Sequence, residues 1–126
     1  MQHLVLVAIG GALGASGRHL ANLAALRLAG PNFPWGTMFV NIAGSLAMGL
    51  FIGWLTRRTG GASNELRLLV ATGFLGGFTT FSAFSLDFAV LWERGAAGGA
   101  VLYAVASVVL AIIAVFAGLW IMRLAS

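Results

Sequence analysis

The stretch that most constrains the fold is GFLGGFTTFSAFS, residues 73–85, which lies inside an apolar segment spanning residues 66–92. Two adjacent glycines are followed by two adjacent threonines, and then by two phenylalanines interleaved with serines. Glycine weakens a helix, and threonine hydroxyls offer the backbone alternative hydrogen bonds. Backbone groups released inside a bilayer need a partner in the protein or in a water-filled path. We therefore predict an interrupted helix in the middle of a membrane span, of the kind that lines an ion path.

The composition points to lipid as the natural solvent of the chain. Of its 126 residues, 60% are hydrophobic and 8% are charged, whereas soluble domains carry about 25% charged residues. A bilayer span requires about 20 apolar residues. We predict an all-α membrane protein with one domain, residues 1–126, and four transmembrane helices, of which the third is broken in mid-membrane. The four spans are expected at residues 4–26, 36–55, 66–92 and 100–122.

The same composition excludes several classes of function. All seven basic residues are arginines that are scattered along the chain, so they form no basic stripe for nucleic acid. The absence of cysteine excludes disulfides and thiolate metal sites, and the two histidines lie far from acids. There is no nucleophile–base pair, so we expect no enzyme. The N-terminal segment lacks a charged leader region and is interpreted as the first span rather than as a signal peptide.

Small residues predict where the helices pack. Gly10 and Gly14 form one GxxxG pattern, and Gly49 and Gly53 form a second. Such patterns allow two membrane helices to approach closely.

Polar residues inside the spans are the candidates for function. Thr37, Asn41 and Ser45 recur every four residues and so share one helical stripe. The Asn41 amide either bonds another helix, which is the commoner case, or presents its NH2 group to a permeating anion. Arg18 fits a snorkelling arginine and a wet cavity equally well. Asp87 is either a snorkelling or paired acid, which is the commoner case, or a gate at a pore mouth.

The distribution of arginine leaves the orientation in the membrane open. The loop between spans two and three and the C-terminal tail carry four arginines, against two or three in the other loops. This is a weak positive-inside bias, so either orientation can insert. A chain of four helices is also small for enclosing a pore. The first observation permits an antiparallel dimer, and both observations favour an oligomer.

Three motifs carry a resemblance to a known family. They are GGALGASGR at residues 10–18, GTMFVNIAGSLAMG at residues 36–49 and GFLGGFTTFSAFS at residues 73–85. In this order and over the whole chain, they resemble the Fluc (CrcB) family of fluoride-specific ion channels. The resemblance implies passive, fluoride-selective export across the bacterial inner membrane. It also implies an antiparallel, dual-topology homodimer with two pores.

The resemblance also implies roles for individual residues. Edge-on phenylalanines can meet an anion because the edge of an aromatic ring is positive. Departures from the family pattern include Ala111, which lacks a hydroxyl that some relatives carry one turn beyond Ser107, and Asp87 in place of glutamate. By motif, the fluoride path would be lined by Asn41, Phe81, Phe84, Tyr103, Ser107 and Thr37; Arg18 would lie in the vestibule; and the backbone carbonyls of Gly76 and Thr79 would hold a structural Na+ at the dimer interface.

Two other classes remain as alternatives. A small four-helix exporter of the multidrug type needs an acidic residue in its first span, and residues 4–26 contain none. A non-transporting membrane assembly protein would use the GxxxG faces. That function gives no reason for the interrupted third span.

Overall fold

The computed structural model of the chain describes residues 1–57 and 64–125, and its regular elements in these ranges are all helical. Three spans are single helices: α1 (Gln2–Ala29), α2 (Trp35–Arg57) and α6 (Ala97–Leu124). The remaining span consists of α3 (Asn64–Arg67), the π-helical segment η1 (Leu68–Leu75), α4 (Gly76–Phe78) and α5 (Ser82–Glu93).

Four helical stretches are long and apolar enough to cross a bilayer, and they confirm the four predicted spans. They extend over Gln2–Ala29, Trp35–Arg57, Asn64–Glu93 and Ala97–Leu124, so each is somewhat longer than predicted. The chain is a multi-pass membrane protein. Most of the polar loop expected at residues 56–64, including Arg58, lies outside the described residues.

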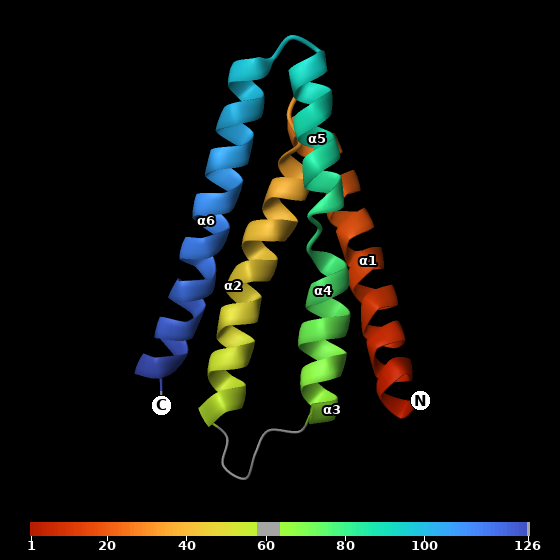
Figure 1. Cartoon of the computed structure of the whole chain (residues 1–126), viewed down its shortest axis with the longest axis vertical. Coiled ribbons are helices and arrows are strands. Elements are labelled where there is room, and N and C mark those ends of the chain that lie inside the picture. The colour runs from red at the N-terminus through yellow and green to blue at the C-terminus, as the bar shows by residue number, and fades with distance from the viewer. Residues whose placement is uncertain (58–63, 126) are drawn as a thin grey trace.

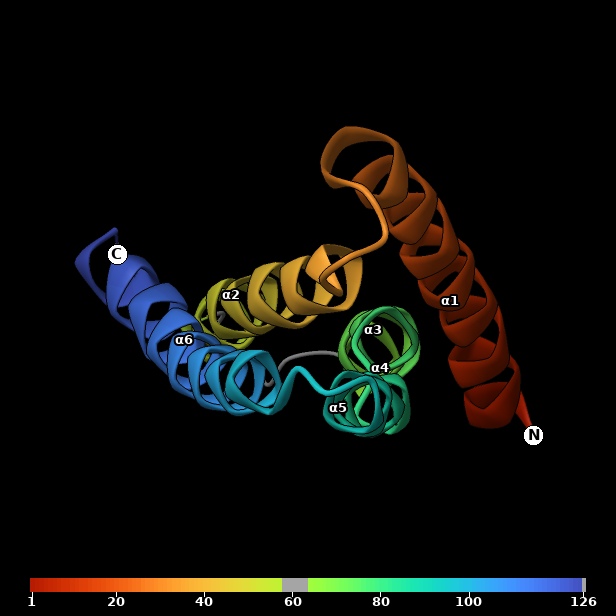
Figure 2. The ribbon, with the colours of Figure 1, turned by 90° about the horizontal axis from the view of Figure 1, so that it is seen from above.

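The spans run side by side along the long axis of the molecule (Figure 1). Seen from above, α1 and α6 occupy opposite sides, with α2 and the interrupted span between them (Figure 2). α2 packs most extensively on α6, and α1 packs on η1, α4 and α2. Both chain termini lie at the same end of the molecule (Figure 1), as four spans require.

Glycines bring the helix backbones into contact, as the GxxxG patterns predicted. Gly10 and Gly14 are buried against the third span, and a Cβ atom on Gly14 would overlap the carbonyl oxygen of Phe74. A Cβ atom on Gly49 would likewise overlap the carbonyl oxygen of Val115 on α6. These approaches leave room for hydrogen atoms only, so they fix the register of each helix pair.

Large apolar side chains cover much of the outer surface, as expected of a protein solvated by lipid. Some of the most buried side chains lie near the end of the molecule where α2 and α6 begin. There, Met38, Leu91, Ala100 and Tyr103 form one cluster.

The glycine contact between α2 and α6 yields a prediction for stability. Gly49→Ala should lower the free energy of unfolding by about 1–3 kcal/mol, because the added methyl group overpacks the contact with Val115. The matched control is Gly98→Ala near the start of α6, where a Cβ atom meets nothing within 4 Å. Thermal unfolding of both variants in detergent checks this. An unchanged or higher midpoint for Gly49→Ala would contradict the packing described.

Candidate functional site

The third span is interrupted at residues 79–81, between the end of α4 and the start of α5. Thr79 adopts an extended backbone with φ −86° and ψ 158°. Its amide and its hydroxyl both donate to the carbonyl of Leu75, at 3.0 and 2.9 Å. The first half of the span therefore ends with its last turn hydrogen-bonded.

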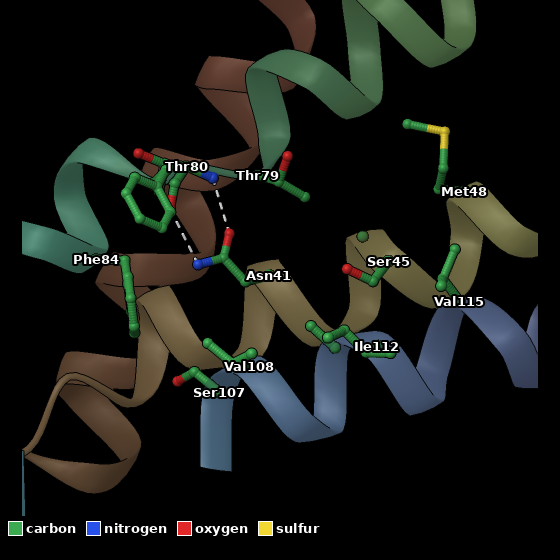
Figure 3. A pocket seen from close by; sticks show the side chains of 13 residues that line it. Asn41, Ser45, Met48, Thr79, Thr80, Phe84, Ser107, Val108, Ile112 and Val115 are labelled. Carbon is green, nitrogen blue, oxygen red and sulfur yellow. Dashed lines mark hydrogen bonds between the residues drawn. The ribbon is translucent and has the colours of Figure 1, made fainter. Parts of the chain in front are cut away.

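Asn41 on α2 pairs with the backbone of the interrupted segment (Figure 3). Its Nδ2 donates to the carbonyl oxygen of Thr80 at 3.0 Å, and the amide of Thr80 donates to its Oδ1 at 2.7 Å. One carboxamide thus satisfies both backbone groups of one residue. Of the two interpretations of Asn41, hydrogen bonding to another span is confirmed. A carboxamide nitrogen carries two donors, so one N–H remains for a ligand.

The same hydrogen bonds release two carbonyl groups. A continuous helix would direct the amide of Thr80 at the carbonyl of Gly76, and the amide of Ala83 at the carbonyl of Thr79. Here the first amide is taken by Asn41, and the second donates to the Thr80 hydroxyl at 3.1 Å. The two carbonyls that lose their helical donors are those expected from the resemblance to hold a cation.

Arg18 lies on the α1 side of the interruption. Its Nε donates to the carbonyl oxygen of Gly77 at 3.2 Å. This position near the C-terminal end of the first half-span is favourable for a cation, because the helix dipole is negative there. Arg18 is half-buried and does not line the pocket beside Asn41.

A pocket of about 380 Å³ opens beside Asn41, between α2, α6 and the interrupted segment (Figure 3). Asn41, Phe81, Phe84 and Ser107, four of the residues expected on a fluoride path, line it. Ser107 is only 4% exposed, and its hydroxyl has no hydrogen-bond partner among the described residues. Burying a hydroxyl without a hydrogen bond costs free energy, so the Ser107 hydroxyl marks a place where a ligand or a water molecule can form one.

The two phenylalanines differ in their surroundings. The Phe84 ring is half-buried, with its centroid 5.1 Å from that of Tyr103 and 5.6 Å from that of Phe81. Phe81 is 77% exposed although it borders the pocket. Its ring therefore projects from the surface of the single chain.

Tyr103 and Thr37 form a separate buried cluster with Asp87. Tyr103 is 0% exposed, and its hydroxyl donates to Asp87 Oδ2 at 3.1 Å. The Thr37 side chain is also buried and lies close to the same hydroxyl. Asp87 thus has a hydrogen-bond partner inside the chain, and its proposed role as a gate stays a prediction. Its carboxylate borders a second pocket, of about 420 Å³, which Asn22 on α1 also lines.

Sequence reasoning did not single out Asn22 or assign Ser45 to a site. No sequence pattern pointed to Asn22, because polar residues are common near the end of a span. Its contact with Gly36 joins two different helices and cannot be predicted from one segment. Ser45 lines the pocket beside Asn41. Its place in the four-residue repeat with Asn41 could have identified it.

Among the described residues, no cluster of three histidine, cysteine or acidic side chains could hold a metal ion. Backbone carbonyl oxygens are ligands of alkali-metal sites in channels, and the interruption releases two of them from their helical donors.

Comparison with known proteins assigns the chain to a family. The family model described as "CrcB-like protein, Camphor Resistance (CrcB)" matches residues 5–119. A protein of Mesorhizobium japonicum named "Fluoride-specific ion channel FluC" is 67% identical over 123 residues, which cover 98% of each chain. Proteins of the same name from Chelativorans sp. and Hyphomonas neptunium are 60% and 57% identical over 123 residues, covering 98% of this chain and 98% and 97% of theirs.

The pairing of Asn41 with Thr80 predicts the effect of removing one donor. Asn41→Asp retains the acceptor for the Thr80 amide but sets a carboxylate against the Thr80 carbonyl. We expect a loss of about 1–3 kcal/mol in stability and faster hydrogen exchange at residues 79–83. The control is Asn32→Asp, the same chemical change on an exposed residue between α1 and α2. Equal stability and exchange in the two variants would contradict the described role of Asn41.

Proposed function

Because this chain belongs to the CrcB family, we propose that it is a fluoride-selective channel that lets fluoride leave the cell across the bacterial inner membrane. The observation that carries the proposal is the pocket beside Asn41. It combines two polar groups that have hydrogen atoms to donate with two phenylalanine rings. The full-length identity to proteins named fluoride-specific channels supports the same function.

The chemistry of the pocket suits a small, strongly hydrated anion. A pore has to replace the lost water with hydrogen-bond donors that do not hold the ion tightly. The second N–H of Asn41 and the hydroxyl of Ser107 are such donors. No charged side chain is among the described residues that line the pocket, so release is not opposed by a fixed counter-charge. The ring edges of Phe81 and Phe84 add weak positive potential.

We further propose that two chains pair as an antiparallel, dual-topology homodimer with two pores. The exposure of Phe81, an aromatic ring at the border of the pocket, supports the proposal because a partner chain would cover it. The interruption lies near the middle of the Asn64–Glu93 span, so a two-fold axis in the membrane plane would bring two interruptions together. In the proposed dimer, the break of the third helix would lie at mid-membrane depth.

A sodium ion at that axis is the third part of the proposal. The carbonyl groups of Gly76 and Thr79 have lost their helical donors, and Gly76 is exposed on the surface of the single chain. Carbonyl oxygens suit a hard monovalent cation. The ion would supply positive charge that holds the two interrupted segments together. The exporter alternative is not favoured, because α1 contains no acidic residue.

Fluoride efflux from liposomes tests the function. Purified protein in liposomes loaded with fluoride and chloride should release fluoride rapidly and retain chloride, as followed with ion-selective electrodes. Protein-free liposomes are the control. Retention of fluoride by liposomes that contain folded protein would refute the proposed function.

The phenylalanines give a sharper test of the path. Phe84→Ile and Phe81→Ile should each slow fluoride efflux by about tenfold, which corresponds to about 1.4 kcal/mol of lost ion stabilisation. The matched control is Phe116→Ile on the exposed face of α6, where efflux should not change. Gel filtration in detergent verifies that each variant keeps its assembly. Efflux at the wild-type rate in both pocket variants would show that the two rings do not contact the ion.

A further inference from the structure

Two helices bordering the pocket, α2 and α6, are aligned in a fixed register. Both start at the same end of the molecule and run in the same direction (Figure 1). The close approach of Gly49 to the Val115 carbonyl fixes the register at one level. The buried side chains of Thr37 and Tyr103, which lie close enough to interact, are the same number of residues apart as Gly49 and Val115.

That offset pairs the remaining residues of the polar stripe on α2 with residues of α6. Asn41 is level with Ser107, so both helices present a polar group there, as they do at Thr37 and Tyr103. Ser45 is level with Ala111, where α6 presents only a methyl group. All four of these residues line the pocket (Asn41, Ser107, Ser45 and Ala111).

The hydroxyls of the two threonines that line the pocket already take part in hydrogen bonds within the interrupted span. The Thr79 hydroxyl donates to the carbonyl of Leu75, and the Thr80 hydroxyl accepts from the amide of Ala83. The half-buried Ser45 side chain, in contrast, makes no hydrogen bond to another of the described residues. Figure 3 shows it on the α2 wall between Asn41 and Met48.

We propose that the Ser45 hydroxyl is an ion-contacting donor of the fluoride path. It stands one helical turn, about 6 Å, beyond Asn41 along α2. A fluoride ion that leaves the Asn41 and Ser107 level meets Ser45 as its next donor, because Ala111 offers none. The inference rests on the proposed channel function and adds to it a residue that determines the rate of passage.

The test uses the α2–α6 register to exchange the donor between helices. Fluoride efflux from liposomes is measured for Ser45→Ala, for Ala111→Ser, and for the double variant. Ser45→Ala should slow efflux by about threefold to tenfold, the value of one hydrogen bond to the passing ion. Ser45→Ala with Ala111→Ser should recover to within about twofold of the unchanged chain, because α6 then supplies the hydroxyl at the same level. Ser16→Ala, on the exposed face of α1, is the matched control and should leave efflux unchanged.

Each outcome separates this inference from the channel function itself. Recovery in the double variant, with thermal unfolding midpoints equal throughout, supports the role of Ser45. No efflux from the unchanged chain would refute the proposed function and this inference with it. Efflux from the unchanged chain with undiminished efflux from Ser45→Ala would refute the inference alone. A slow Ser45→Ala variant that Ala111→Ser does not rescue would also refute it, since a donor at that level would then not be what the ion needs.

Discussion

The pair of hydrogen bonds between Asn41 and the backbone of Thr80 is the interaction on which the interrupted span depends. A backbone that leaves the helical path inside a bilayer has no water to replace its hydrogen bonds. Asn41 satisfies both backbone groups of Thr80, at 3.0 and 2.7 Å. The Thr80 hydroxyl then accepts the amide of Ala83 in the manner of a helix N-cap. The backbone groups of Thr80 are thus satisfied within the chain, and the carbonyls of Gly76 and Thr79 lose their helical donors.

Glycine packing makes this pairing geometrically possible. A Cβ atom on Gly44 would overlap the side chain of Thr79, so the interrupted segment rests directly on the α2 surface next to Asn41. From the opposite side, Gly14 lets α1 approach the backbone of the third span at Phe74 and Phe78. The third span is therefore packed between two helix surfaces that contain glycine. A short side chain such as asparagine reaches the backbone only because the helices lie this close.

Local features of the sequence were enough to predict the spans and their glycine contacts, because length, hydropathy and helical periodicity are properties of single segments. The partners of polar side chains are tertiary, which is why the sequence left them open. The residue type of Asn41 favours a bond to another helix but does not exclude an ion contact, and its partner lies 39 positions away. Arg18 likewise meets Gly77 across 59 positions. The exposure of Phe81 is not predictable from a pattern either, since the same residue spacing is compatible with a buried ring.

The two halves of α2 differ in what they present to their neighbours, and this difference determines where the pocket lies. Its first half presents Thr37, Asn41 and Ser45 as a polar stripe, whereas its second half presents Gly49 and Gly53 to α6. Where Gly49 meets the Val115 carbonyl, the two backbones are too close for an ion to pass between them. The pocket accordingly ends at this level. In the proposed channel, a fluoride ion following the stripe has to leave the seam between α2 and α6 beside Ser45. The Ser45 hydroxyl, the last of the stripe, is therefore the last hydrogen-bond donor of α2 that the ion meets before it leaves this seam. This position explains why the loss of this hydroxyl should slow fluoride passage.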